Sequence, residues 1–186
     1  MSETIELKTE RLVLRRLCQE DIAQLLPLIG AREVAATTLR IPHPYTLEHA
    51  LSFLKSSDSA WAKGEAARFG IFLRDRERLC GDVGLSVNLE HHHAELGYWI
   101  GMPFWGKGYC TEAAREILKY GFNTLNLHRI HSGHYSNNPA SGRILRKLGM
   151  KYEGTRKQHV CKWGEYLDVE IYGLLASEYR SQAAGR

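Results

Sequence analysis

The chain has 186 residues, of which 44% are hydrophobic and 25% are charged, and its formal net charge is +4. This length fits one domain with a continuous core, and the composition argues against disordered and fibrous classes of protein. The four cysteines are scattered and form no Cys-x-x-Cys pair, which argues against a disulfide framework or a zinc site and favours a reducing compartment.

The N-terminus is acidic and lacks the apolar run of a secretory signal. No apolar stretch approaches the roughly 18–20 residues that cross a bilayer. We therefore expect a cytoplasmic protein with no membrane association. Basic residues concentrate between positions 143 and 162. They suit a nucleic-acid surface, the rim of a pocket for a polyanionic cofactor, or simply a solvated face.

Hydrophobic periodicity and turn residues predict the elements in chain order. The expected strands are 7–17, 68–73, 79–88, 94–100, 129–135, 152–161 and 169–174, and the expected helices begin at 20–22, 46, 109 and 139. Thr46 is the expected cap of the second helix, and Gly149 is expected to stop the last. This order predicts a mixed α/β or α+β domain around one central sheet of about seven strands. We expect a single domain over residues 1–186, with a core at about 7–180.

The turn from Gly101 to Glu112 carries the most information about function. A strand runs into glycines and then directly into a helix, so several backbone N–H groups converge at the helix N-terminus. Unpaired donors and the positive end of the helix dipole together bind phosphate. Gly106 and Gly108 let the backbone approach an anion with no Cβ in the way.

Three phosphate-binding patterns compete for this turn. A Walker A loop matches at Gly101, Gly106 and Lys107, but it fails at Gly108, where that motif requires Ser or Thr. A dinucleotide fingerprint lacks its third glycine, because Thr111 stands there, and no early βαβ unit surrounds it. The third pattern is the pyrophosphate turn of a known acyltransferase family.

The sequence Trp-Gly-Lys-Gly-Tyr-Cys-Thr-Glu-Ala at 105–113 resembles the coenzyme A loop of the RimJ/RimL-type branch of GNAT N-acetyltransferases. The family pattern is Gln or Arg, two residues, Gly, one residue, then Gly or Ala. Trp105 replaces the first residue, as is usual in this branch, and Cys110 replaces the last. Further similar segments follow in the family's order at 9–15, 94–100, 129–130, 138–141, 145–150, 153–154 and 168–175.

This resemblance implies a single N-acetyltransferase domain with a GNAT-type acyl-CoA N-acyltransferase fold, whose mixed, mostly antiparallel sheet splays between the strands at 94–100 and 129–135 and is flanked by helices. The pantetheine arm of acetyl-CoA would lie in this opening and pair with the backbone of Trp99, Ile100 and Gly101. The pyrophosphate of acetyl-CoA would lie on the N–H groups of residues 106–111. Asn138 would bond the arm, although its place before Pro139 also suits a plain N-cap. The implied cofactor-binding residues are Trp99, Ile100, Gly101, Trp105, Gly106, Lys107, Gly108, Tyr109, Cys110, Thr111, Asn138 and Ser141.

The implied reaction is direct attack of a primary amine on the thioester in a ternary complex. An α-amino group titrates near pH ~8 and a lysine near ~10.4, so a base or a water relay helps. Glu95 is the expected base, because family members place a carboxylate there, and an ion-pair partner is the alternative role. The backbone N–H near Ile100 is the expected oxyanion donor. Ser141 is the expected acid for the thiolate, with Tyr135 as the second candidate, and a plain surface serine is the alternative for Ser141.

The histidines do not predict a metal site. Three consecutive histidines at 91–93 on a turn cannot converge on one ion. His131 and His134 lie three apart on one strand and therefore on opposite faces. His134 either lines the cleft or is a buried structural histidine.

The family acetylates protein N-termini, including those of ribosomal proteins, and also polyamines, antibiotics and other small amines. Acceptor contacts are expected from 34–46 and 157–167, and the subfamily resemblance favours a peptide N-terminus. The alternatives are a small-molecule amine acetyltransferase, a non-catalytic acyl-CoA sensor and, less favoured, a nucleic-acid-binding module. A monomer and a homodimer are both compatible with the sequence.

Overall fold

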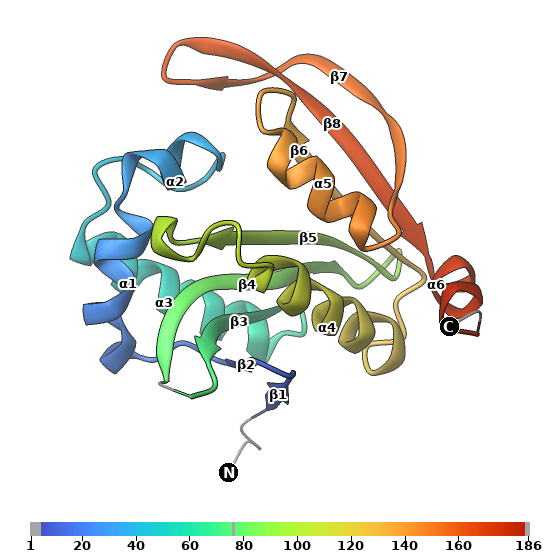
Figure 1. The fold of residues 1–186 in the computed structure, drawn as a ribbon, viewed down its shortest axis with the longest axis horizontal. Coiled ribbons are helices and arrows are strands. Elements are labelled where there is room, and N and C mark those ends of the chain that lie inside the picture. The colour runs from blue at the N-terminus through green and yellow to red at the C-terminus, as the bar shows by residue number, and fades with distance from the viewer. Residues whose placement is uncertain (1–4, 76, 185–186) are drawn as a thin grey trace.

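The computed structural model describes residues 5–75 and 77–184, which form one sheet with helices on both faces (Figure 1). The strands are β1 (Glu6–Lys8), β2 (Leu12–Arg15), β3 (Ala66–Leu73), β4 (Arg78–Asn88), β5 (His93–Ile100), β6 (Arg129–Tyr135), β7 (Lys151–Lys162) and β8 (Glu165–Leu175). The helices are α1 (Ile22–Ile29), α2 (Arg32–Ala36), α3 (Leu47–Ala62), α4 (Tyr109–Asn123), α5 (Pro139–Lys147) and α6 (Ala176–Ala184), with 3-10 turns η1 (Gln19–Asp21) and η2 (Met102–Phe104).

Residues 1–4, which belong to the acidic N-terminus discussed above, lie outside the described residues. Within the described ranges, no helix combines the length and the apolar character that crossing a bilayer requires.

The sheet has eight strands in the order β1-β2-β3-β4-β5-β6-β8-β7. Every neighbouring pair is antiparallel except β5 and β6, which are parallel. The mostly antiparallel mixed sheet is therefore confirmed. The stretch 7–17, expected as one strand, is divided into β1 and β2 by a turn, because the Thr9 N–H bonds back to the Leu12 carbonyl. Helices α2 and α6 were not expected from the sequence.

The two faces of the sheet pack against different helices. One cluster joins Leu96 and Ile100 of β5 to Ile117 of α4 and Leu145 of α5. The other joins Trp99 of β5 to side chains of α1 and α3. Because side chains alternate along a strand, the face toward α4 and α5 takes the even residues of β5, and the face toward α1 and α3 takes the odd ones.

The sheet opens between β5 and β6. Only three residues of each strand pair, His93–Glu95 with 129–131, and beyond them the two strands are not paired. The side chain of Ser132 spans the start of the opening, where its hydroxyl donates to the Leu96 carbonyl at 2.8 Å. The sequence expectation of a splayed sheet matches this geometry.

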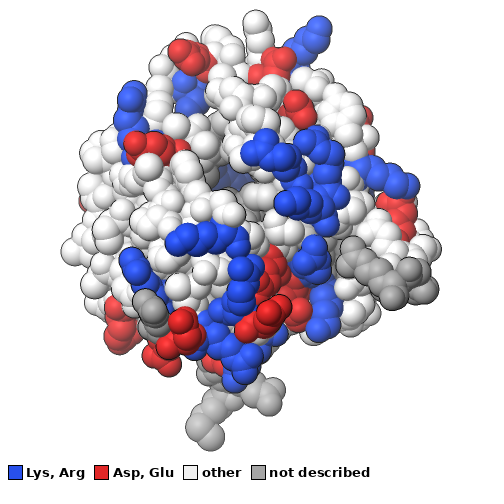
Figure 2. All heavy atoms as spheres, viewed as in Figure 1, with Lys and Arg blue, Asp and Glu red and all other residues white. Residues whose placement is uncertain are grey.

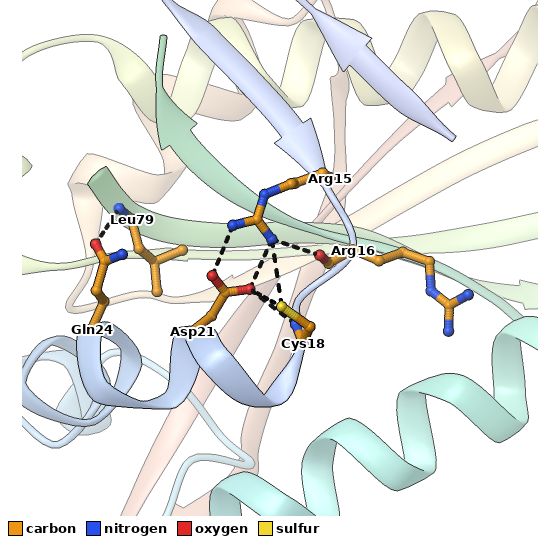
Figure 3. Close-up of polar contacts among 6 residues, drawn as sticks. All are labelled: Arg15, Arg16, Cys18, Asp21, Gln24 and Leu79. Atoms are coloured by element: carbon orange, nitrogen blue, oxygen red, sulfur yellow. Dashed lines mark hydrogen bonds and ion pairs between the residues drawn. The ribbon is translucent and has the colours of Figure 1, made fainter. Parts of the chain in front are cut away.

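A buried polar network ties the start of α1 to the sheet (Figure 3). Arg15 at the end of β2 donates two hydrogen bonds of 2.8 Å to Asp21, and the Cys18 N–H donates to the same carboxylate at 2.9 Å. Burial acts to raise the pKa of Asp21, but these partners outweigh it and lower the pKa. One turn later, the Gln24 side chain accepts a hydrogen bond from the Leu79 N–H of β4. These contacts fix α1 against the strands that carry the site.

Candidate active site

The glycine-rich turn forms the N-terminus of α4, as the sequence predicts. Gly106 and Gly108 have positive φ angles of 74° and 80°, which L-residues with a Cβ rarely adopt. Gly108 is the N-cap, and within the described residues no side chain caps the helix. The first N–H groups of α4, from Tyr109 on, therefore remain available to an anion.

Thr9 and Arg11, in the turn between β1 and β2, bind Glu112 of α4, and we call these three residues the clamp. Glu112, in the first turn of α4, accepts hydrogen bonds from the Thr9 hydroxyl at 2.6 Å and the Arg11 N–H at 2.9 Å. The Arg11 side chain also bonds Glu112 at 2.7 Å and the Lys107 carbonyl at 3.1 Å. Burial acts to raise the pKa of Glu112, but the bonds from Thr9 and Arg11 outweigh it and lower the pKa. The sequence pattern predicts a strand over residues 9–11 and gives no sign of this contact.

The backbone of β5 faces the opening at alternate residues. The Leu96 carbonyl points toward β6, so the backbone groups of Tyr98 and Ile100 point the same way. Two groups expected to be free for pantetheine are already bonded. The Gly101 N–H donates to the Cys80 carbonyl at 2.9 Å, and the Ile100 carbonyl accepts from the Trp105 indole at 2.6 Å.

Two hydroxyl groups meet at the opening, on the face of α5. The Tyr98 hydroxyl lies 2.7 Å from the Ser141 hydroxyl. Ser141 is 9% exposed and is therefore no plain surface serine. Its N–H donates to the Asn138 side chain at 3.3 Å, so Asn138 caps α5. Burial is the main cause that raises the pKa of Tyr98, which keeps its phenol protonated. Tyr98 was not among the residues picked from the sequence, although it lies in the strand segment that resembles the family.

Glu95 and His131 lie on the other face of the opening. They are Cα partners in the last paired position of β5 and β6. Glu95 is an odd residue of β5, so it lies on the face of Trp99, toward α1 and α3. Its side chain is 50% exposed and lies 3.8 Å from Arg40 of the loop after α2. This leaves Glu95 accessible, with a loop cation as its partner.

Tyr135 and His134 occupy opposite faces of β6. The Tyr135 hydroxyl is buried and has no hydrogen-bond partner in the described part of the chain, and no described contact joins it to Ser141. His134 is buried beneath α5, where an added Cβ on Gly142 would lie 2.6 Å from its Nε2. Its ring stacks on Tyr172. His134 is therefore a structural histidine, and the expectation that His131 and His134 face opposite sides is confirmed.

The tip of the β7–β8 hairpin contacts the loop that carries Arg40, the partner of Glu95. The Lys162 ammonium donates to the Ile41 carbonyl at 3.0 Å, and the Arg32 guanidinium lies 5.1 Å from the centre of the Trp163 ring. The two segments expected to contact the acceptor, 34–46 and 157–167, thus meet. Figure 1 shows the hairpin reaching over α2, and Figure 2 shows a hollow in the surface between α2 and α5, with Lys and Arg side chains gathered over α5.

A buried carboxylate lies on the same face as Glu95. Asp82 of β4 pairs with Trp99 across the strands and is fully buried. One of its oxygens accepts from Arg68 at 2.8 Å, and the other has no partner among the described groups. Burial raises the pKa of Asp82 to about 6, against the pull of the Arg68 guanidinium. Nothing in the sequence pattern singled it out.

Histidines 91, 93 and 131 form a row, but they do not form a metal site. The rings of His91 and His93 stack with centroids 6.0 Å apart, and those of His93 and His131 are 5.4 Å apart. In the described residues, no three His, Cys, Asp or Glu side chains come together as metal ligands would.

Comparison with known proteins identifies the family. The model of the acetyltransferase (GNAT) domain matches residues 11–151. The chain belongs to the GNAT family. It is 32% identical over 175 residues to the uncharacterized N-acetyltransferase p20 of Bacillus licheniformis, covering 93% of this chain and 97% of that protein. It is 31% identical over 119 residues to the ribosomal protein uS5-alanine N-acetyltransferase of Escherichia coli, covering 63% of this chain and 61% of that protein.

Solved structures of the family share the fold. Spermidine N-acetyltransferase of Vibrio cholerae, in a complex with CoA and spermine, superposes with a TM-score of 0.80 at 25% identity, over 92% of this chain and 99% of that one. The protein is therefore an acetyl-CoA-dependent N-acetyltransferase, and its relatives include ribosomal-protein acetyltransferases. The resemblance seen in the sequence is confirmed.

Proposed function

We propose that this GNAT enzyme transfers the acetyl group of acetyl-CoA directly to the α-amino group at the N-terminus of a peptide or protein. The observation that carries the proposal is the end of pairing between β5 and β6 at Glu95 and His131. The opening that begins there joins the uncapped N-terminus of α4 on one side to Glu95 on the other.

The substrate acetyl-CoA fits this opening by charge and by backbone chemistry. The N–H groups from Gly106 to Thr111 would take the pyrophosphate, and the exposed Arg143, Arg146 and Lys147 of α5 add positive charge beside the hollow. The pantetheine arm would pair with the inward backbone groups of Tyr98. The Asn138 amide nitrogen remains a donor for the arm while its oxygen caps α5.

Different groups of the protein carry out the separate steps of acetyl transfer. A base on the Glu95 face of the opening takes the proton of the acceptor ammonium, directly or through a water molecule, and the amine attacks the thioester carbon. The Ile100 N–H stabilises the oxyanion. As the C–S bond breaks, Ser141 gives its proton to the sulfur and recovers one from Tyr98. The amine nitrogen then gives its second proton to Tyr98, which restores the Tyr98–Ser141 pair, and the base releases the first proton to solvent.

The charges around the entrance favour an acceptor with one amine over a polyamine. Arg40 lies beside Glu95, and Arg32 and Lys162 flank Trp163 at the hairpin tip. A polycation would meet these like charges, whereas the backbone carbonyls of a peptide would meet hydrogen-bond donors. The named activity of the E. coli relative, on ribosomal protein uS5, supports the same choice.

A small amine is the second candidate. Glu95 and the buried Asp82 are acidic groups on the acceptor face, and a structural neighbour is a spermidine acetyltransferase. A non-catalytic sensor of acyl-CoA would use the same opening without turnover.

A thiol-release assay with acetyl-CoA tests the proposal. We expect release with hexapeptides that begin with Ala or Ser, and about tenfold less with spermidine or an aminoglycoside at equal concentration. Preferential release with spermidine would select the second candidate. Coenzyme A binding by calorimetry with no release from any acceptor would select the sensor.

A further inference from the structure

His131 is the neighbour of Glu95 at the mouth of the opening. The two residues are partners in register, and partners on adjacent strands have their side chains on the same face. Ile130 belongs to the cluster under α4 and α5, so His131 points away from those helices. Gly133, the next residue on that face, is exposed and leaves the approach to His131 open.

The charges around His131 come from three strands. Burial is the main cause that lowers its pKa, His93 of β5 and Arg129 of β6 act in the same direction, and the carboxylates of Glu95 and Glu153 oppose them. The His131 ring therefore stays neutral at neutral pH, with a carboxylate beside it that would stabilise an imidazolium.

An imidazole is a better acceptor than a carboxylate for the proton that the acceptor ammonium must lose. Carboxyl groups in water titrate about two pH units below imidazole, so a carboxylate holds a proton from an amine only briefly at neutral pH. Glu95 is half exposed and already has Arg40 as a partner. A carboxylate that steadies a neighbouring imidazole is a recurrent arrangement in general-base catalysis.

We propose that His131 is the general base of the acetyl transfer and that Glu95 stabilises its protonated form. The inference rests on the proposed function and assigns its proton acceptor. The acceptor ammonium loses one proton to an imidazole nitrogen of His131, and the freed lone pair forms the C–N bond. The C–S bond then breaks, the thiolate receives the second proton through Ser141, and His131 releases the first proton to solvent.

The test compares His131→Gln, Glu95→Gln and the control His91→Gln. His91 belongs to the same row of rings but is exposed and lies beyond His93. With an Ala-terminated hexapeptide at pH 7, we expect kcat/KM to fall about a hundredfold in His131→Gln, less in Glu95→Gln, and to stay within twofold in the control. The His131→Gln loss should shrink above about pH 8, where the free α-amine is abundant. His131→Asn replaces His131→Gln if the latter fails to fold by circular dichroism.

Two results would overturn the assignment. One is a His131→Gln loss that is equal at every pH, and the other is a larger loss in Glu95→Gln than in His131→Gln. If the wild-type enzyme transfers to no peptide or spermidine, the proposed function fails, and the pair is tested separately by NMR titration of His131. There Glu95→Gln should lower the titration midpoint by about half a pH unit or more, and an unchanged midpoint would refute the pairing.

Discussion

The hydroxyl groups of Tyr98 and Ser141 lie 2.7 Å apart, although the two residues stand 43 positions apart on β5 and α5. Their contact joins β5 to α5, and in the proposed mechanism it holds an orientable hydroxyl beside the thioester sulfur. Because either oxygen can donate, the pair can pass a proton to the sulfur and be restored without a change in its heavy-atom geometry.

Removal of the Ser141 hydroxyl should affect the rate much more than binding. We expect Ser141→Ala to lower turnover about ten- to a thousandfold and to leave the coenzyme A dissociation constant within a few-fold, since a proton donor to the leaving sulfur acts mainly in the transition state. Tyr98→Phe should lose less, because Ser141 remains. Stopped-flow thiol release and calorimetry measure the two effects. Equal losses in rate and affinity would make Ser141 a positioning residue.

Binding of coenzyme A should depend on the backbone of the turn. Gly108 has a φ of 80°, so Gly108→Val should weaken binding more than tenfold through strain and a β-branched Cβ at the helix N-terminus. Lys107→Ala should have a smaller effect, because the Lys107 side chain is exposed. Calorimetry that gave the reverse order, with both variants folded, would refute the binding geometry.

The clamp on α4 should contribute stability with a defined pH dependence. The folded-state pKa of Glu112 is lowered, so its contribution is present above the unfolded pKa and is lost as the pH falls through the folded value. Glu112→Gln should therefore be less stable than the wild type above about pH 5, and the difference should vanish in more acidic solution. Urea unfolding measures this difference.

The matched control for the clamp is Glu116→Gln. Glu116 lies on the same helix, and its side chain pairs at 3.1 Å with the exposed Lys119 one turn later, so its replacement should change stability by no more than about 0.5 kcal/mol. A pH-independent loss in Glu112→Gln would indicate lost packing in place of lost charge.

Asp82 should produce the opposite pH dependence. Its pKa is raised to about 6 from an ordinary 3.8, so the folded state holds the proton more tightly than the unfolded state does. Stability from this group is therefore lost as the pH rises from about 4 to about 6, by about 3 kcal/mol at most. As the pH rises across that interval, the free energy of unfolding of Asp82→Asn, measured with urea, should increase relative to that of the wild type. A constant difference between the two proteins would show that Asp82 stays ionised.

Much of the fold could be predicted because its signals are local. Thr46 caps α3 by accepting from the His49 N–H, and Gly149 stops α5 with a φ of 80°. Short elements such as α2 carried no strong periodicity. The turn that separates β1 from β2 has a local hydrogen bond, but it is also held by Glu112, 101 positions after Arg11 in the sequence.

The site was predicted less completely, for the same reason. The glycines at 106 and 108 indicate a turn from the sequence alone, whereas the Tyr98–Ser141 contact depends on how α5 packs over β5. The alternation of β6 separated His131 from His134 correctly. It did not show which of them lies beside Glu95, because that follows from the register of two strands whose first residues lie 36 positions apart.

A pair of peptides tests whether the enzyme acetylates the α-amino group. The peptides share an Ala-initiated sequence with one internal lysine, and they differ only in a free or a formylated N-terminus. We expect acetyl-CoA-dependent acetylation of the free peptide alone, located at the first residue by tandem mass spectrometry. Acetylation of the lysine in both peptides, or of spermidine in preference to the free peptide, would contradict it.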